Sequence, residues 1–88
     1  MLLAWQAHGW ADYLYWQEHD RKMLVRINEL LRDAMRHPFE GLGKPEPLRG
    51  QMKGAWSRRI SQEHRLVYYV EGQGDRQLLT ILQCRFHY

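Results

Sequence analysis

The order of apolar and polar residues at the start of the chain predicts a strand followed by a helix. Residues 1–5 are all apolar, which favours a short β-strand. Further on, the three- and four-residue spacing of one helix face occurs at Trp10, Tyr13, Leu14 and Gln17. We therefore expect a short amphipathic helix over 8–18, although no strong N-capping residue marks where it begins.

A second helix is predicted more sharply because both of its ends are marked. Asp20 lies where an N-capping side chain is expected, and Pro38 ends the pattern because the residue before a proline avoids helical geometry. Between them a single apolar stripe runs through Leu24, Ile27, Leu30, Leu31 and Ala34. The break between the two helices falls near residues 19–20, which predicts a tight helical hairpin.

The second half of the chain has the pattern of a β-sheet. Residues 39–54 contain four glycines and two prolines, and they predict an ordered loop that is longer than most connections. The strands expected after it are 55–60, 65–70 and 78–86, and the turns that join them are 61–64 and 71–77. Two helices followed by a run of strands predict one α+β domain over 1–88, with both helices on one face of an antiparallel sheet.

Composition supports a small globular domain. The 88 residues are 44% apolar and 26% charged, which is ordinary for a folded chain and argues against disorder. No apolar run approaches the roughly 20 residues that a membrane span requires, and we expect no signal peptide and no membrane partner. One cysteine, Cys84, excludes an internal disulfide and fits a reducing cytoplasm.

The net charge of +3 is unevenly distributed. Residues 1–20 contain three acidic residues and no lysine or arginine, so they sum to −3. Residues 21–60 contain ten basic and four acidic residues, so they sum to +6. A basic middle fits an anionic partner, with nucleic acid the leading candidate, and it fits equally well a solvated helix face with ordinary loop charges.

The sequence KPEP restrains the backbone around one carboxylate. Pro45 has a fixed φ, and Pro47 drives Glu46 toward extended geometry. A preorganised carboxylate suits a general base, which must meet a substrate proton at one angle. A rigid loop with a solvent-exposed glutamate is the structural alternative.

Three arginines lie in the segment WSRRISQEHRLVYYV. Strand alternation places Arg65 on the same face as Val67 and Tyr69, and it sends Arg58 and Arg59 to opposite faces. An arginine at the start of a strand can clamp a phosphate through its planar guanidinium. The same residue could equally be an edge charge that keeps the sheet soluble.

The C-terminal segment QCRFHY extends the expected last strand. Regular alternation assigns one face, expected to pack on the helices, to Leu78, Leu82, Cys84 and Phe86. The opposite face is assigned to Leu79, Ile81, Gln83, Arg85 and His87. His87 is therefore expected on an open polar face, unless the end of the chain is simply frayed.

The candidate residues can support a reaction on RNA that uses no metal and no cofactor. The five histidines show no clustered ligand spacing, and a single cysteine cannot build a thiolate site. RNA carries its own nucleophile, and its cleavage needs a base for the 2′-OH, an acid for the leaving 5′-oxygen and a cation for the phosphorane. Glu46, His87 and Arg65 supply one group of each kind. Their convergence in space does not follow from composition.

The chain resembles the YoeB-like branch of the RelE/ParE superfamily of bacterial toxin–antitoxin systems. The resemblance spans essentially the whole chain, and it is carried by DYLYWQEHD (12–20), INELLRDAMRHPFEGLGKPEPL (27–48), WSRRISQEHRLVYYV (56–70) and CRFHY (84–88). It implies a microbial RNase-like fold with two N-terminal helices against a curved antiparallel sheet. It also implies a cytoplasmic toxin of a bacterium that cleaves mRNA in the ribosomal A site without a metal, and so inhibits translation.

The resemblance also implies roles for individual residues. Glu46 corresponds to the general base, Arg65 to the transition-state stabiliser, His87 to the general acid and Tyr88 to a residue that orients the substrate. RNA or ribosome contacts are implied for Lys44 and Arg59. Two roles are equally supported, an RNA or ribosome contact and a plain solvated face, for Arg49, Lys53 and Arg58. The branch commonly has tyrosine where this chain has Phe86, and the change removes only a hydroxyl if that side chain faces the core.

The expected partners follow from the same resemblance. They are the 70S ribosome with its mRNA, and a cognate antitoxin of the Phd/YefM type that wraps a C-terminal segment over the toxin. The sequence leaves open whether the free protein forms a homodimer. Since related toxins on this fold target DNA gyrase and fold does not determine function, the alternative is a non-catalytic inhibitor that binds another target.

Overall fold

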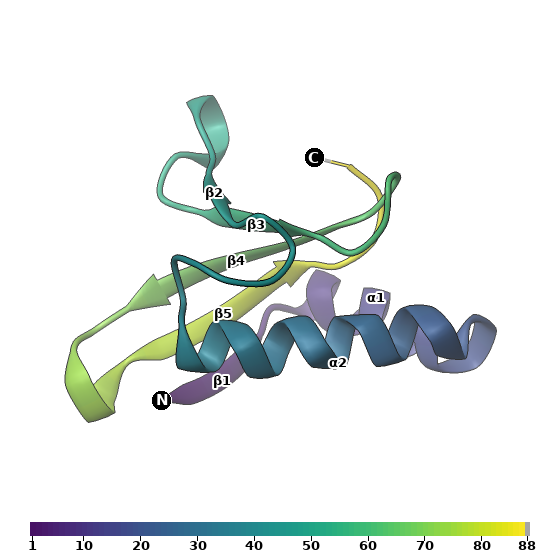
Figure 1. Ribbon diagram of the computed structural model, residues 1–88, viewed down its shortest axis with the longest axis horizontal. Coiled ribbons are helices and arrows are strands. Elements are labelled where there is room, and N and C mark those ends of the chain that lie inside the picture. The colour runs from purple at the N-terminus through teal and green to yellow at the C-terminus, as the bar shows by residue number, and fades with distance from the viewer. Residues whose placement is uncertain (88) are drawn as a thin grey trace.

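The computed structural model, which describes residues 1–87, has two helices on one face of a five-stranded sheet (Figure 1). The elements in chain order are β1 (Leu2–Trp5), α1 (Ala7–His19), α2 (Arg21–Arg36), β2 (Glu46–Pro47), β3 (Trp56–Arg59), β4 (Arg65–Glu71) and β5 (Leu78–Gln83). Two short 3₁₀-helices, η1 (Gly50–Met52) and η2 (Gly74–Arg76), lie in the connections. The predicted α+β class and the position of both helices on one face are confirmed.

The helical hairpin forms because Asp20 serves both helices. Its backbone N–H donates to the carbonyl of Trp16 at the end of α1, and its carboxylate accepts from the N–H groups of Lys22 (3.1 Å) and Met23 (3.3 Å) at the start of α2. The second helix ends at Arg36, shortly before the proline. Neither helix is long and apolar enough to cross a membrane, and the same holds for every helix within residues 1–87.

The sheet is mixed, which the sequence did not indicate. Its strand order is β1-β5-β4-β3-β2, and β1 runs parallel to β5, from the pair Leu2 with Leu78 to the pair Trp5 with Ile81. The other neighbouring strands are antiparallel. A parallel pair needs a long crossover, which α1, α2 and the following strands supply.

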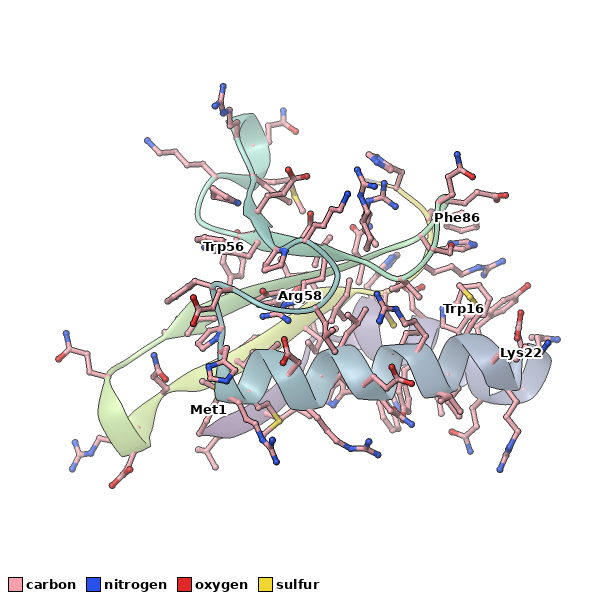
Figure 2. The ribbon with its side chains drawn as sticks, in the orientation of Figure 1. Met1, Trp16, Lys22, Trp56, Arg58 and Phe86 are labelled. Atoms are coloured by element: carbon pink, nitrogen blue, oxygen red, sulfur yellow. The ribbon has the colours of Figure 1, made fainter. Side chains whose placement is uncertain are left out.

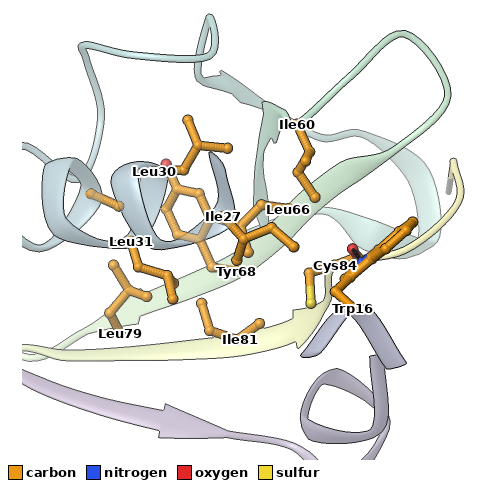
Figure 3. Packing of buried hydrophobic residues seen from close by; sticks show 11 residues of the cluster. Trp16, Ile27, Leu30, Leu31, Ile60, Leu66, Tyr68, Leu79, Ile81 and Cys84 are labelled. Carbon is orange, nitrogen blue, oxygen red and sulfur yellow. Dashed lines mark hydrogen bonds between the residues drawn. The ribbon is translucent and has the colours of Figure 1, made fainter. Parts of the chain in front are cut away.

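The main core lies between the helices and the sheet (Figure 3). Side chains from α2 meet the inner face of β4 and β5, and the fully buried members include Ile27, Leu30, Leu66, Tyr68 and Ile81. A second, smaller cluster lies on the opposite face of the sheet and consists of Leu48, Ala55 and Val67, with Met52, Tyr69 and Leu82 packed around it. Apolar side chains therefore cover parts of both faces.

One irregularity in β5 changes which residues face the core. Tyr68 pairs with Ile81, whereas the adjacent Val67 pairs with Gln83, so Leu82 is an extra residue on β5. An extra residue of this kind is a β-bulge, and it reverses the side-chain alternation on either side of itself. Bulges commonly lie beside functional sites, and this one directly precedes the C-terminal segment.

The bulge explains an error in the predicted alternation. Leu79 and Ile81 are fully buried in the main core, although regular alternation assigned them to the open face. Cys84, which lies beyond the bulge, is buried in the same core as expected. The strand also ends at Gln83 and does not continue to Phe86.

Gly9 sets the distance between α1 and β5. A β-carbon at this position would lie 2.6 Å from the carbonyl oxygen of Ile81, closer than real contacts allow. We expect Gly9→Ala to lower the free energy of unfolding by about 1–3 kcal/mol, since the helix would have to move off the strand. Urea unfolding followed by circular dichroism measures this change.

A control separates this packing effect from helix propensity. Ala11 is exposed on the same helix, and Ala11→Gly is expected to cost only the propensity difference of about 1 kcal/mol. In a helix without a close neighbour, Gly→Ala is stabilising by a similar amount. A stabilised Gly9→Ala protein would contradict the proposed close packing.

Candidate catalytic surface

The sheet register brings two of the predicted catalytic residues onto one face. A row of directly paired residues runs across four strands through Glu46, Ser57, Val67 and Gln83. Directly paired residues project from the same side of a sheet, and Val67 packs in the cluster away from the helices. Glu46 therefore lies on the open face, and this cross-strand relation could not be read from the sequence.

Arg59 and Arg65 lie on the same open face as Glu46. They pair directly with each other on β3 and β4, and each lies two residues along its strand from the row that contains Glu46. With strands about 4.8 Å apart and residues about 3.3 Å apart along a strand, the Cα atoms of Glu46 and Arg65 are separated by about 12 Å.

The guanidinium of Arg65 is held on one edge by the turn between β3 and β4. Nη1 donates to the carbonyl oxygens of Ser61 (2.7 Å), His64 (3.1 Å) and Gln62 (3.2 Å). Among the described residues, these are the hydrogen bonds of this side chain, and all of them use the same nitrogen. The fixed edge orients the rest of the fork in advance, which is what a group that stabilises developing charge requires.

The C-terminal tail, residues 84–87, is attached to α1 at its first residue. The backbone N–H of Cys84 donates to the buried carboxylate of Asp12 (3.0 Å), and its carbonyl accepts from Nε1 of Trp16 (2.8 Å). Burial, reinforced by the charge of Asp12, raises the pKa of the Cys84 thiol to about 12. The thiol therefore stays protonated at neutral pH, and its role is to pack in the core.

The tail is attached a second time to the turn between β3 and β4. The N–H of Arg65 donates to the carbonyl of Phe86 (3.1 Å), and the N–H of Phe86 donates to Nδ1 of His64 (2.7 Å). The frayed-end alternative is thus wrong for 84–86. His87, which is exposed, directly follows a residue bonded to Arg65, and Figure 1 shows this end of the chain on the side of the sheet away from α2.

Phe86 does not face the core, which corrects the expectation from alternation. Its side chain is 57% exposed and its φ is +66°, a left-handed conformation in which the strand pattern no longer applies. The guanidinium of Arg85 lies 3.4 Å from the ring centroid of Tyr15 on α1 and 4.4 Å from that of Phe86. The tail therefore leaves the sheet, and Arg85 stacks between an α1 ring and the Phe86 ring.

The remaining predicted site residues differ in how far the structure describes them. Tyr88 lies outside the described residues, so its role stays a prediction. The exposed basic residues of the connection and of β3 are Lys44, Arg49, Lys53 and Arg59. Within residues 1–87, no group of three or more His, Cys, Asp or Glu side chains is arranged to hold a metal ion.

Arg58 is not a surface residue, and its assignment to RNA or ribosome contact is wrong. It is fully buried between β3, α2 and the loop after α2 (Figure 2). Nε donates to Oη of Tyr68 (2.9 Å) and Nη1 to Oδ2 of Asp33 (2.6 Å). The remaining hydrogen bonds run to the carbonyl oxygens of His37, Glu40 and Leu42.

This buried arginine organises the loop that leads to Glu46. Three loop carbonyls point at one guanidinium, and just beyond them the carbonyl of Gly43 accepts from the N–H of Arg59 (2.7 Å). Gly43 has a φ of +80°, and a β-carbon there would lie 2.8 Å from Leu30 and 3.0 Å from Arg58. The sequence contained a signal for this role, because Arg58 alternates with the apolar Trp56 and Ile60 on the core side of the strand.

Asp33 completes the network and gives it a pH dependence. The N–H of Leu42, followed by Arg58, holds the pKa of the Asp33 carboxyl below its usual 3.8. Its stabilising contribution is therefore present above pH 3.8 and is lost as the pH falls through the lower pKa of the folded state. Burial raises the pKa of Tyr68, which keeps that hydroxyl protonated as a donor to Pro38.

We expect Asp33→Asn to lower the free energy of unfolding by about 1–3 kcal/mol at pH 7, because charge-assisted hydrogen bonds are lost. In the variant, stability should fall less steeply than in the wild type as the pH is lowered below 3.8. Urea unfolding at a series of pH values measures both effects. Asp75→Asn, at an exposed position, serves as the control, and equal acid slopes for Asp33→Asn and wild type would contradict this account.

A helical hairpin on one face of a mixed five-stranded sheet is the fold of YoeB/ParE-type toxins. Residues 5–88 match the family described as the YoeB-like toxin of bacterial type II toxin–antitoxin systems. The chain belongs to this family, and it is a toxin of a type II toxin–antitoxin system.

Similar proteins and solved structures agree with this family assignment. Toxin YoeB of Escherichia coli strain K12 is 53% identical over 88 residues, which cover 100% of both chains. A YoeB/ParE toxin structure from Agrobacterium tumefaciens is 57% identical, with a TM-score of 0.95 and 100% coverage of both chains. In a heterotetrameric YoeB–YefM toxin–antitoxin complex from Staphylococcus aureus, one chain is 42% identical, with a TM-score of 0.86 and coverage of 100% of this chain and 99% of that chain.

Proposed function

We propose that this protein is a ribosome-dependent endoribonuclease that cleaves mRNA in the ribosomal A site and so inhibits translation. The observation that carries the proposal is the sheet register, which places Glu46 and Arg65 on one open face. The tail that bears His87 is hydrogen-bonded to the backbone of Arg65. These positions support the assignment of a base, a cation and an acid to one side of the sheet.

In the proposed reaction, Glu46 removes the proton from a ribose 2′-OH, and the resulting oxygen attacks the adjacent phosphorus. Arg65 stabilises the charge that develops on the phosphoryl oxygens. His87 gives a proton to the departing 5′-oxygen, so the bond from phosphorus to that oxygen breaks as the bond to the 2′-oxygen forms. The products are a 2′,3′-cyclic phosphate and a free 5′-OH, and the nucleophile comes from the RNA itself.

The proposal assigns roles to the surrounding residues. Tyr88 orients the substrate, as the family resemblance implies. The exposed side chains that would contact phosphates of mRNA or ribosomal RNA are Lys44, Arg49, Lys53 and Arg59. Such contacts fix orientation and carry little sequence information, so codon preference would arise from the ribosome-bound message.

We propose a cognate antitoxin of the Phd/YefM type as the protein partner, by analogy with the heterotetrameric complex of the Staphylococcus aureus protein. The excess of basic residues over 21–60 favours an acidic antitoxin segment. A protein that acts on translating ribosomes in a bacterium would work in the cytoplasm.

A cell-free translation reaction with one defined mRNA tests this function. Purified protein is added with and without ribosomes, and the new 5′ ends are mapped by primer extension. We expect cuts at ribosome-occupied codons, and little cleavage of the same RNA alone. Intact mRNA together with inhibition of gyrase supercoiling would favour the alternative of a non-catalytic inhibitor.

A further inference from the structure

The side chain of His64 holds the backbone N–H of Phe86, the residue before His87. His64 lies in the turn between β3 and β4, and its Nδ1 accepts a hydrogen bond from the N–H of Phe86 (2.7 Å). Its ring is packed edge-on against Trp16 with a centroid distance of 4.8 Å, and it lies 5.8 Å from the ring of Phe86. The imidazole is therefore fixed by α1 on one side and by the tail on the other.

This contact determines the protonation of the imidazole. A neutral histidine has one donor and one acceptor nitrogen, whereas a charged histidine has two donors. Because Nδ1 accepts from Phe86, it carries no proton, and the proton lies on Nε2. The tail is thus held by the neutral ring in one of its two tautomers.

The residue held in this way has an unusual backbone. Phe86 has a φ of +66°, which is disfavoured for a residue with a β-carbon. Both of its backbone polar groups are bonded to consecutive residues, the N–H to His64 in the turn and the carbonyl to Arg65 at the start of β4. These two bonds hold the left-handed residue that sets the direction of the chain into His87.

The contacts of the tail with α1 lie further from His87. The bonds of Cys84 to Asp12 and Trp16 fix where the chain leaves α1. They lie two residues before Phe86 and do not control rotation about its φ and ψ angles. The side chain of His64 is thus the part of this anchor that a substitution can remove without changing the tail itself.

We propose that His64 is a positioning residue for RNA cleavage. As a neutral acceptor it fixes the conformation of Phe86 and thereby aims the imidazole of His87 at the leaving oxygen. The proposal rests on the proposed function of His87 as the general acid. It assigns no contact between His64 and RNA.

Two isosteric substitutions test the role of the acceptor. In His64→Asn the side-chain oxygen lies near the position of Nδ1 and can accept from Phe86, whereas in His64→Gln the polar group lies near the position of Nε2. We expect His64→Asn to cleave within about threefold of wild type, and His64→Gln to lose about 10²-fold in kcat, the cost of a catalytic group displaced by about 1 Å. Equal activity of the two variants, at any level, would overturn the proposal.

Nuclear magnetic resonance tests the anchor independently of catalysis. In the wild type, long-range ¹H–¹⁵N spectra should show Nδ1 of His64 without a proton, and the amide proton of Phe86 should exchange slowly. Slow exchange should persist in His64→Asn and be lost in His64→Gln. A proton on Nδ1, or wild-type exchange in His64→Gln, would overturn the proposal.

The two measurements separate this inference from the proposed function. If the anchor is observed and wild type cleaves no mRNA on ribosomes, the proposed function fails and the role in positioning falls with it. If wild type cleaves and His64→Gln cleaves equally well despite a released Phe86 amide, only the role of His64 is overturned. Loss of cleavage in His64→Gln with unchanged ribosome affinity would support positioning of His87.

Discussion

Replacing Arg58 with methionine is expected to lower the free energy of unfolding by about 3–5 kcal/mol. Methionine keeps an unbranched apolar side chain but removes the buried guanidinium and its hydrogen bonds. The carbonyls of His37, Glu40 and Leu42 lose this donor, and the donor that remains to the carboxylate of Asp33 is the N–H of Leu42. In a domain of this size such a loss corresponds to a fall in Tm of about 15 °C or more. Differential scanning calorimetry and urea unfolding measure it.

The neighbouring arginine provides a matched control for this prediction. Arg59 lies on the same strand and is exposed, so Arg59→Met is expected to change the free energy of unfolding by no more than about 0.5 kcal/mol. Arg58→Lys should fall between the two, because one ammonium group cannot replace the planar fork. If Arg58→Met and Arg59→Met were equally stable, the buried network would not be holding the loop.

The burial of Arg58 depends on residues that are distant from it in the sequence. Alternation correctly separates Arg58 from Arg59, but a charged residue in a basic segment predicts a surface group. Its burial depends on Asp33, which is 25 residues away in the sequence, and on loop carbonyls that no residue pattern reveals. The hairpin at Asp20 was predictable because a capping side chain and its helix are adjacent in the chain.

The sequence predicts the three main strands of the sheet, but not which residues of β5 face the core. The segment from Leu78 to Leu82 is almost entirely apolar because both faces of β5 are covered, by the helices on one side and by the smaller cluster on the other. Alternation therefore could not show which residues face inward, and the bulge at Leu82 left no local signal. The parallel pairing of β1 and the two-residue strand at Glu46 likewise depend on contacts distant in sequence.

The candidate site was predictable as a set of residue types and not as an arrangement. Alternation places Arg65 with Val67 and Tyr69. The cluster away from the helices contains Val67 and Tyr69, and the regular pairing of β3 with β4 keeps Arg65 on the same face. The lateral row from Glu46 to Gln83 depends on strand register, which is set by pairing across the sheet. The anchoring of the tail on α1 and on His64 joins residues that are 22 to 72 positions apart.

The largest change in activity is expected from the two groups assigned to proton transfer. We expect Glu46→Gln and His87→Gln each to slow cleavage of ribosome-bound mRNA by about 10²–10⁴-fold, because each amide keeps the size of the side chain and cannot exchange the proton. Both side chains are exposed, so unfolding free energies should stay within about 0.5 kcal/mol of wild type. Single-turnover cleavage on programmed ribosomes measures the rate.

The double variant distinguishes a shared reaction from two separate defects. Groups that act in one proton-transfer cycle are strongly non-additive, so Glu46→Gln/His87→Gln should be only slightly slower than the slower single variant. Glu71→Gln and His19→Gln, two exposed positions away from the proposed site, should cleave at the wild-type rate. Full multiplication of the two losses would indicate that Glu46 and His87 act in independent steps, such as binding and folding, and would contradict acid–base catalysis by this pair.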